Sequence, residues 1–343
     1  MPITVVVLLL VGEAGARVVG PHLPRTAGTE QESVIKAGDI DRRSGGPTNV
    51  IFLGSSETVA GLIPRTFDDT SRAFSSSYNA ALPAGLGTAQ EWATRIVVPR
   101  LKPKVAVVGL FPIELISFSG GAQQYESRSD DAYREAFDKI DPSGLGRLDR
   151  TLQGWSALFR YRDGLRNPGD LYDGIRSLVT GAGPRLPDNP DPGATRAFVE
   201  RTGENREYQA SPQAIRPDPA FAKNMNDLAT GTFVLKPLTD LLRSLRREGV
   251  RPVVALLPID RTTLTAAGVD FTPLDRTDTK IQQAAAQLHV PVIDGFRQSY
   301  APNLFHDQLH LDLTGARQWT EAVARQIDRF CATRALGRSC SPS

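Results

Sequence analysis

The stretch Asn49-Val50-Ile51-Phe52-Leu53-Gly54-Ser55-Ser56 decides the predicted fold. Its apolar, β-branched run ends at a glycine, and such a short run predicts a strand buried on both faces of a parallel sheet. Ser55 and Ser56 follow directly, where the chain leaves the carboxyl end of that strand. The stretch therefore predicts a parallel sheet with two serine hydroxyls at its edge.

Four further apolar runs predict the other strands of this sheet, at residues 77–82, 105–110, 252–257 and 290–293. Helical patterns separate or follow them, at residues 87–98, 232–248, 278–288 and 313–330. Alternation of strands and helices with right-handed crossovers gives a parallel sheet covered by helices on both faces. We therefore predict a doubly wound α/β fold with five parallel strands.

A long segment interrupts this alternation after the third strand. About 120 residues lie between that strand and the helix expected at 232–248, far more than a connection needs. We interpret residues 119–231 as a large, mostly helical insertion or cap, with helices at 130–140 and 148–162. The predicted α/β domain then comprises residues 48–118 and 232–332, and residues 333–343 form a tail.

The N-terminal region has features of an export signal. Ile3–Val11 is an apolar run of nine residues, and Ala14-Gly15-Ala16 follows with the small-x-small pattern of a cleavage site. No basic residue precedes the run, and a spanning helix needs roughly 20 apolar residues. We expect residues 1–20 to be part of a signal or membrane anchor whose true start lies upstream. The alternative is a buried first strand or helix.

We expect residues 21–47 to be a linker, with order beginning near Thr48.

Charge and cysteine content limit the possible functions. The chain has 40 Lys and Arg against 38 Asp and Glu, a net charge of +2, which is too balanced for a nucleic-acid-binding surface. The only two cysteines are Cys331 and Cys340, in the last 13 residues. They either form a disulfide, as in an oxidising compartment, or remain two free thiols. Their spacing does not fit a zinc site, and we predict no metal or organic cofactor.

A second polar stretch, Phe305–Gly315, lies between the last predicted strand and the last helix. It contains two of the four histidines. His310 is a candidate general base, and Asp307, three residues earlier, is a candidate to orient its imidazole. Asp312 is better placed to cap the last helix. Since the carboxyl ends of parallel strands share one edge, Ser56, Asp307 and His310 are expected to meet there.

These motifs resemble the SGNH (GDSL-type) hydrolase superfamily. Gly54-Ser55-Ser56 matches its first block and Asp307–His310 its last, and the resemblance covers residues 49 to about 115 and 232 to about 330. It implies a flavodoxin-like sheet, the SGNH hydrolase fold. It also implies that Ser56, rather than Ser55, is the nucleophile of a Ser-His-Asp triad.

The resemblance also bears on the oxyanion hole. Residues 79–85 (NAALPAG) are similar to the second block, with Ala84 where the glycine is expected and Gly85 next to it. Gly109-Leu110-Phe111-Pro112 occupies the third block, so Phe111 replaces the asparagine that donates a hydrogen bond. The resemblance then implies an oxyanion hole of backbone N–H groups from Ser56 and Ala84 or Gly85, or a donor from the insertion.

The motifs look most like the bacterial cell-envelope branch of the superfamily. That resemblance implies an exported, membrane-anchored serine esterase or O-acyltransferase acting on acyl esters of envelope polysaccharide. It further implies a membrane-bound O-acyltransferase as a possible partner. Two alternatives to a plain esterase remain: a transferase that receives acyl groups from such a partner, and a non-catalytic glycan-binding or assembly protein. Phe111 motivates the second.

Overall fold

The computed structural model describes residues 2–23, 36–37, 39–41, 43–82, 86–117, 151–152, 155–166, 168–181 and 217–340. The helix predicted at 130–140 and most of the insertion lie outside the described residues, as do Ala84 and Gly85.

The central sheet has five strands, all parallel, in the order β2-β1-β3-β6-β7. The strands are β1 Val50–Leu53, β2 Ser77–Asn79, β3 Val105–Leu110, β6 Arg251–Leu256 and β7 Val292–Asp294. The prediction of an α/β fold with five parallel strands is confirmed, and the strand order is consistent with a flavodoxin-like sheet. The chain order reverses between β1 and β3, which is where such sheets form a crevice at their carboxyl edge.

Alternating side chains of the strands fill two separate cores. Ile51 and Leu53 of β1 belong to the core on one face, and Val50 and Phe52 belong to the core on the other. Every residue of β1 and β3 is buried, because helices cover both faces of the sheet. This is why the strands read as continuous apolar runs instead of alternating apolar and polar residues.

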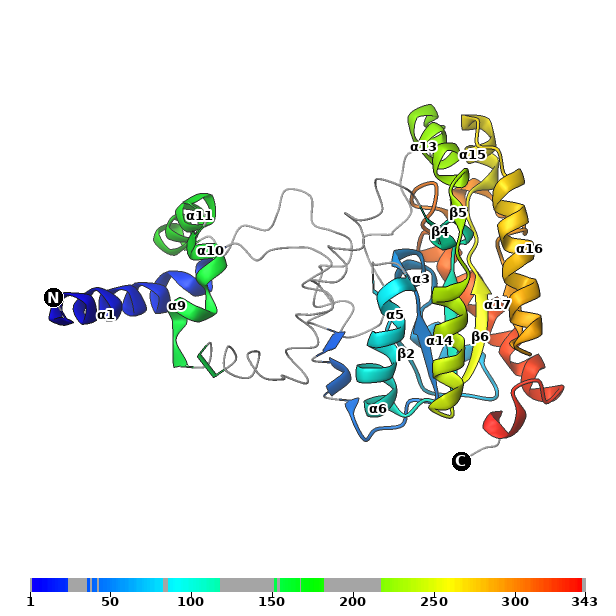
Figure 1. Ribbon diagram of the computed structural model, residues 1–343, viewed down its shortest axis with the longest axis horizontal. Coiled ribbons are helices and arrows are strands. Elements are labelled where there is room, and N and C mark those ends of the chain that lie inside the picture. Colours follow the sequence, from blue (N-terminus) through cyan, green and yellow to red (C-terminus); the bar gives the residue numbers. More distant parts are fainter. Residues whose placement is uncertain are drawn as a thin grey trace.

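Two sets of helices build these layers (Figure 1). The first core is covered mainly by α5 Leu86–Trp92, a π-helix Ala93–Val97, α6 Val98–Leu101, α13 Pro219–Ala229, α14 Lys236–Arg247, α15 Arg261–Ala267 and α16 Thr272–Gln287. On the opposite face lie α3 Ser56–Gly61, α4 Pro64–Thr70 and α17 Leu313–Ala332. Trp319 of α17, 1% exposed, centres the second core.

Two predicted helices have different starts in the structure. The helix expected at 232–248 begins only at Lys236, because Thr232–Phe233 form strand β5, which pairs antiparallel with β4, Ile116–Ser117. The helix expected at 278–288 begins at Thr272, with a proline in its first turn. Proline is favoured there because the first helical N–H groups have no intrahelical acceptor.

The expectation that order begins near Thr48 is wrong. Ala37 and Ile40, three residues apart, are fully buried in the first core. Lys36 is also buried, and its ammonium donates to the carbonyl oxygen of Ala81. The segment before β1 therefore packs on the α/β domain, a contact that its Gly- and Arg-rich composition did not indicate.

The N-terminal residues are helical, in α1 Pro2–Val19, followed by the 3-10 turn η1 Gly20–His22. The alternative of a buried first element does not hold for Leu9, Leu10 and Val11, which are all exposed. In the part of the chain that is described, we find no helix with the length and apolarity needed to cross a membrane.

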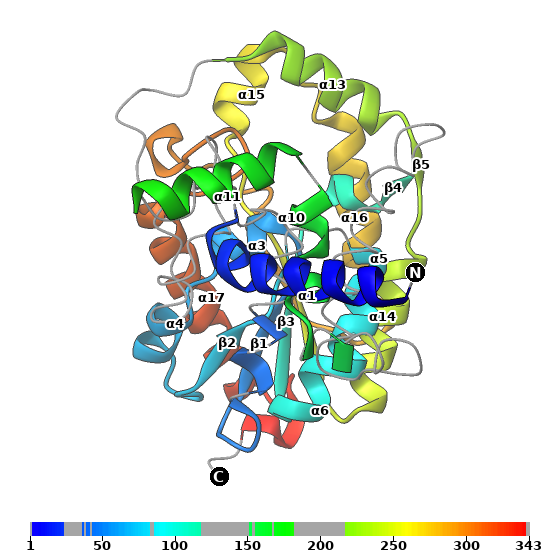
Figure 2. The ribbon, with the colours of Figure 1, turned by 90° about the vertical axis from the view of Figure 1, so that its left-hand side faces the viewer.

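The described part of the predicted insertion contains α9 Ala157–Arg160, α10 Arg162–Arg166 and α11 Pro168–Thr180, and near its end α13, which packs on the first core of the sheet. The group α9–α11 packs with α1 and lies at one end of the molecule, towards the viewer in Figure 2. At the other end of the chain, Cys331 and Cys340 form a disulfide, which favours the first of the two alternatives for these residues.

Candidate active site

Ser56 is presented at the carboxyl end of β1 by a tight turn. Gly54 has a φ of +148°, and a Cβ at this position would lie 2.2 Å from Thr58 Oγ1 and 2.5 Å from the carbonyl oxygen of Gly109. A Cβ on Gly109 would lie 2.1 Å from the same Thr58 atom. Both glycines thus let β1, β3 and the first turn of α3 approach closely, and only glycine fits.

The asparagine of the second predicted block stabilises this turn from β2. Asn79 Nδ2 donates to the carbonyl oxygens of Leu62 at 2.7 Å and Thr58 at 3.1 Å, and its Oδ1 accepts from the N–H of Ala81. The side chain therefore satisfies carbonyl groups in the last turn of α3 and just after it, and ties them to the end of β2. Asn79 positions the Ser56 helix, and its amide is already committed to backbone partners.

The loop after β7 folds back on itself around Asp307. Asp307 Oδ1 accepts the N–H groups of Leu309 at 2.8 Å and His310 at 2.7 Å, as in an Asx turn. A bridge between Phe305 and Leu311 closes the base of the loop. Asp307 Oδ2 lies 2.8 Å from His310 Nδ1, so one carboxylate fixes both the backbone and the imidazole of the residue three positions later.

The structure brings the three predicted triad residues together. His310 Nε2 lies 3.0 Å from Ser56 Oγ, so Asp307, His310 and Ser56 form a continuous hydrogen-bonded chain. Burial raises the pKa of Asp307, but the hydrogen bond and charge of His310 and two backbone N–H groups outweigh it. The pKa of Asp307 therefore lies below its usual value, and the carboxylate stays ionised. An ionised Asp307 holds the imidazole with its proton on Nδ1, which leaves Nε2 free to accept a proton from Ser56.

Neighbouring elements hold this loop in place. Asp312 caps α17 by accepting the N–H of Gly315 at 2.7 Å, as predicted for it. Gly315 in turn lies so close to the loop that a Cβ would approach the carbonyl oxygen of Leu304 to 2.2 Å. The loop is thus clamped against the start of α17.

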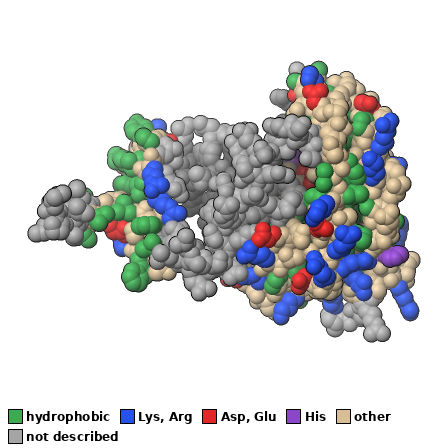
Figure 3. Space-filling model, viewed as in Figure 1, with side chains coloured by type: hydrophobic (Ala, Val, Ile, Leu, Met, Phe, Trp, Pro, Cys, Tyr) green, Lys and Arg blue, Asp and Glu red, His purple; other side chains and the backbone are tan. Residues whose placement is uncertain are grey.

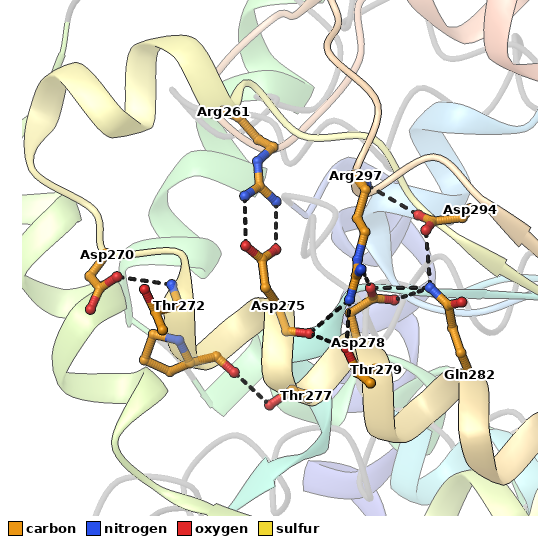
Figure 4. Close-up of polar contacts among 11 residues, drawn as sticks. Arg261, Asp270, Thr272, Asp275, Thr277, Asp278, Thr279, Gln282, Asp294 and Arg297 are labelled. Atoms are coloured by element: carbon orange, nitrogen blue, oxygen red, sulfur yellow. Dashed lines mark hydrogen bonds and ion pairs between the residues drawn. The ribbon is translucent and has the colours of Figure 1, made fainter.

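A polar network on α16 fixes the other end of the loop (Figure 4). Asp294, the last residue of β7, accepts from Gln282 Nε2 at 3.0 Å and from the N–H of Arg297 at 3.1 Å. Arg297 also pairs with the buried carboxylate of Asp278, and Gln282 donates to that carboxylate. These contacts fix the direction in which the chain leaves β7. The loop that follows then places Asp307 and His310 beside Ser56.

Two glutamates that the sequence analysis did not single out lie beside the nucleophile. Ser55 Oγ is 2.5 Å from Glu57 Oε2 and 2.9 Å from Glu114 Oε1, and Ser56 Oγ is 3.3 Å from Glu57 Oε2. Glu114 belongs to a 3-10 turn, Pro112–Leu115, directly after β3. Sequence offered one signal for each: Glu57 follows Ser56, and Glu114 follows a strand that ends at the same edge.

The two carboxyl groups compete for one hydroxyl proton. Ser55 Oγ can donate to Glu57 or to Glu114 but not to both at once, so two ionised carboxylates beside it are disfavoured. Burial and the negative charge of Glu57 raise the pKa of Glu114 to about 8, against the opposing effect of its bonds with Phe111 and Ser55. Glu114 is therefore neutral at pH 7, while its Oε2 is buried without a hydrogen-bond partner.

The third predicted block provides no side-chain donor. Phe111 is 1% exposed and packs against Phe296, with ring centroids 5.9 Å apart. Its backbone N–H donates to Glu114 Oε1 at 2.9 Å. The third block therefore offers no free side-chain donor, and the carboxyl group beside Ser55 comes from Glu114, two residues after the block. Ser56, the first residue of α3, lies at the site, whereas Ala84 and Gly85 lie outside the described residues.

Within the described ranges, no group of three or more His, Cys, Asp and Glu side chains is arranged to hold a metal ion. Comparison of the sequence with protein-family models and with curated proteins found no match. The geometry of the site is therefore the basis for assigning a function.

Proposed function

We propose that this protein is an SGNH-type serine esterase or O-acyltransferase that acts on acyl esters, with cell-envelope polysaccharide as its substrate class. The observation that carries the proposal is the chain Asp307–His310–Ser56, with contacts of 2.8 Å and 3.0 Å, at the carboxyl edge of a parallel sheet. Ligands of such sheets bind at that edge. The chain order Ser, Asp, His and the strand order β2-β1-β3-β6-β7 are both consistent with this superfamily.

In the proposed mechanism, Ser56 Oγ attacks the carbonyl carbon of the acyl ester while its proton moves to His310 Nε2. The new C–O bond gives a tetrahedral oxyanion, which would be held by the N–H of Ser56 and of Ala84 or Gly85. The oxyanion collapses, the bond to the alcohol breaks, and His310 returns its proton to the departing oxygen. Asp307 stabilises the imidazolium in the interval.

The second half of the reaction decides between hydrolase and transferase. Water or a sugar hydroxyl loses its proton to His310 and attacks the acyl-enzyme carbonyl, and Ser56 then regains that proton as it leaves. Water gives a free acid, and a sugar hydroxyl gives a new ester. In the transferase version, a membrane-bound O-acyltransferase would load the acyl group. No metal or organic cofactor is required for these steps.

The proposal includes export and attachment to the outer face of the cytoplasmic membrane. The disulfide between Cys331 and Cys340 supports it, because disulfides persist in oxidising compartments. The apolar start of α1 also supports it, since three of its residues, Leu9, Leu10 and Val11, are exposed.

The second candidate is a glycan-binding or assembly protein that has kept the scaffold without catalysis. Phe111 favours this candidate, because its side chain is buried and its N–H already donates to Glu114, so neither can stabilise an oxyanion. Loss of one oxyanion donor typically reduces turnover by roughly 100 to 1,000-fold.

A fluorophosphonate probe tests the proposal directly. The full chain is incubated with the probe and examined by intact mass, alongside Ser56→Ala, His310→Ala and the matched control Ser55→Ala. We expect one probe per chain in the wild type and in Ser55→Ala, and no labelling in Ser56→Ala or His310→Ala. Absence of labelling in the folded wild type contradicts an activated Ser56 and favours the binding role.

A second measurement separates the two reactions. The wild type is given an acylated carbohydrate or an activated acyl ester, with and without a glycan acceptor. Release of free acid at a rate independent of the acceptor indicates a hydrolase. A new ester on the acceptor, formed faster than free acid, indicates a transferase.

A further inference from the structure

Exposed apolar side chains are concentrated on one helical unit, defined as α1, α9–α11 and Trp155, which directly precedes α9. In the described part of the chain, every large hydrophobic residue that is exposed belongs to this unit, and none belongs to the α/β domain. They are Leu9, Leu10, Val11, Val18, Trp155, Phe159, Tyr172, Ile175 and Val179. Figure 3 shows hydrophobic side chains, in green, gathered at the end of the molecule away from the sheet. Exposed hydrophobic residues gathered in one region mark an interaction surface.

The unit is held together by polar contacts and close packing. Glu13 of α1 accepts from Ser156 Oγ at 2.7 Å and from the N–H of Ala157 at 2.8 Å at the start of α9. The N–H of Ala157, followed by the hydroxyl of Ser156, lowers the pKa of Glu13 to about 2. Gly174 of α11 lies so close to η1 that a Cβ would approach Leu23 to 2.9 Å. These contacts fix α9 and α11 against α1.

The helix α11 presents its apolar residues outward. Tyr172, Ile175 and Val179 are spaced i, i+3 and i+7, so they form one stripe, and they are 67%, 46% and 78% exposed. The opposite face carries the buried Gly174 and Ser177 and the half-buried Leu171 and Leu178. α11 is therefore apolar on its exposed face as well, whereas a surface helix of a soluble domain normally carries polar residues there. The stripe is therefore shaped for contact with something outside the described residues.

The chemistry of this surface fits a lipid bilayer. Trp155, 80% exposed, and Tyr172 have amphipathic rings that favour the membrane–water interface. Arg166 at the end of α10 and Arg176 of α11 are both exposed and can supply cations for lipid phosphate groups. The apolar run of α1 ends in this unit as well. Aromatic, aliphatic and arginine side chains in one region are typical of helices that lie in a membrane interface.

We propose that the stripe Tyr172–Ile175–Val179, with Trp155 and Phe159, docks the protein onto a phospholipid surface, and that this is a role of the predicted insertion. The surface uses no residue of the catalytic site. Lipid docking and the proposed enzyme activity can therefore be tested separately. Ser56→Ala is expected to bind lipid as the wild type does.

Trp155 gives an intrinsic reporter. The chain has three tryptophans, and Trp92 and Trp319 are each only 1% exposed, so lipid-dependent changes in emission arise from Trp155. The full chain is titrated with vesicles of phosphatidylcholine containing phosphatidylglycerol. We expect a blue shift, quenching by lipids brominated on their acyl chains, loss of acrylamide quenching, and co-flotation with the vesicles. In Trp155→Phe the fluorescence change disappears while flotation persists.

The decisive variant carries Tyr172→Ser, Ile175→Ser and Val179→Ser. These side chains are exposed, so the variant is expected to keep the circular dichroism spectrum and melting temperature of the wild type. Its affinity for the vesicles should fall by roughly tenfold or more, because apolar burial in the interface is lost. Equal affinity of this variant overturns the proposal.

Other occupants of the surface give different results, each of which overturns the proposal. If α1 alone tethers the chain, Trp155 of the bound protein remains accessible to acrylamide. If a second copy covers the stripe, Trp155 emission shifts with protein concentration without vesicles, and sedimentation shows a dimer. If another part of the chain covers it, Trp155 is already protected from acrylamide in buffer.

Discussion

His310 Nε2 lies 3.0 Å from Ser56 Oγ, although the two residues are 254 positions apart in the chain. The contact joins the loop after the last strand of the sheet to the helix after the first. Parallel strands end at the same edge, and the strand order places β1 and β7 on opposite sides of β3 and β6. The loop after β7 must therefore cross this edge to reach Ser56, and its anchoring by Asp294, Arg297 and Asp312 gives it a fixed path.

Asp307→Asn is expected to leave the loop intact and abolish most activity. The asparagine Oδ1 can still accept the N–H groups of Leu309 and His310, which lie 2.8 Å and 2.7 Å from Asp307 Oδ1 in the wild type. Its NH₂ then faces His310 Nδ1 and forces the imidazole proton onto Nε2, which can no longer accept the proton of Ser56. Turnover should fall by roughly 1,000- to 10,000-fold. Ester hydrolysis and probe labelling measure it, with Asp312→Asn as the matched control that keeps activity.

Replacement of Glu114 by glutamine should change how stability depends on pH. The pKa of Glu114 is raised from 4.5 to about 8 in the folded protein, so between these values the folded state binds more proton than the unfolded state. Stability from this group is complete below pH 4.5 and is lost as pH rises through about 8. Glu114→Gln cannot lose a proton and should not show this loss.

Urea unfolding at several pH values tests this difference. The free energy of unfolding of the wild type should decline relative to that of Glu114→Gln as pH rises from about 5 to about 9. Glu321→Gln, at an exposed ion pair on α17, serves as the control and should run parallel to the wild type. Parallel curves for Glu114→Gln and wild type contradict a protonated Glu114.

Gly109→Ala is expected to destabilise the protein through a single neighbour. The added Cβ would lie 2.1 Å from Thr58 Oγ1, and its other close contacts are also to the Thr58 side chain. Overpacking of this kind costs roughly 1–3 kcal/mol. Thr58→Ala removes the obstructing atoms, so the double variant should recover part of the loss, as measured by thermal or urea unfolding.

Gly54→Ala provides the contrast. Its Cβ would meet the carbonyl oxygen of Gly109 at 2.5 Å as well as Thr58, and its φ of +148° disfavours any side chain. Thr58→Ala should therefore fail to rescue it. If Thr58→Ala rescues Gly54→Ala as well as it rescues Gly109→Ala, then the backbone conformation of Gly54 and the carbonyl oxygen of Gly109 are not what requires glycine at position 54.

Asp312→Ala should lower stability without acting on the chemistry. Asp312 accepts the N–H of Gly315 at 2.7 Å and so caps α17, which carries the core residue Trp319. Loss of an N-cap costs about 0.5–2 kcal/mol. Equilibrium unfolding measures this cost. At a temperature where the variant is folded, probe labelling of Ser56 should match the wild type, and a large loss of labelling contradicts a capping role.

The amino-acid sequence by itself determined the five strands of the central sheet and placed the three candidate catalytic residues at its edge. β1 and β3 lie in continuous apolar runs because they are buried on both faces. Such a run can be recognised in the sequence without knowing which residues pack against it. Ser56, Asp307 and His310 were predictable since each follows a predicted strand at a common edge. The cap at Asp312 was predictable because capping is a local interaction.

Only the tertiary structure decided the surroundings of that triad. Glu57 and Glu114 become one proton-sharing cluster through Ser55, and the raised pKa of Glu114 depends on burial that arises only when β3 packs beside β1. The core position of Ala37 and Ile40, the pairing of Thr232–Phe233 with β4, and the outward stripe of α11 likewise depend on partners distant in sequence. Local residue patterns specify periodicity and caps, whereas burial and charge coupling are properties of the packed chain.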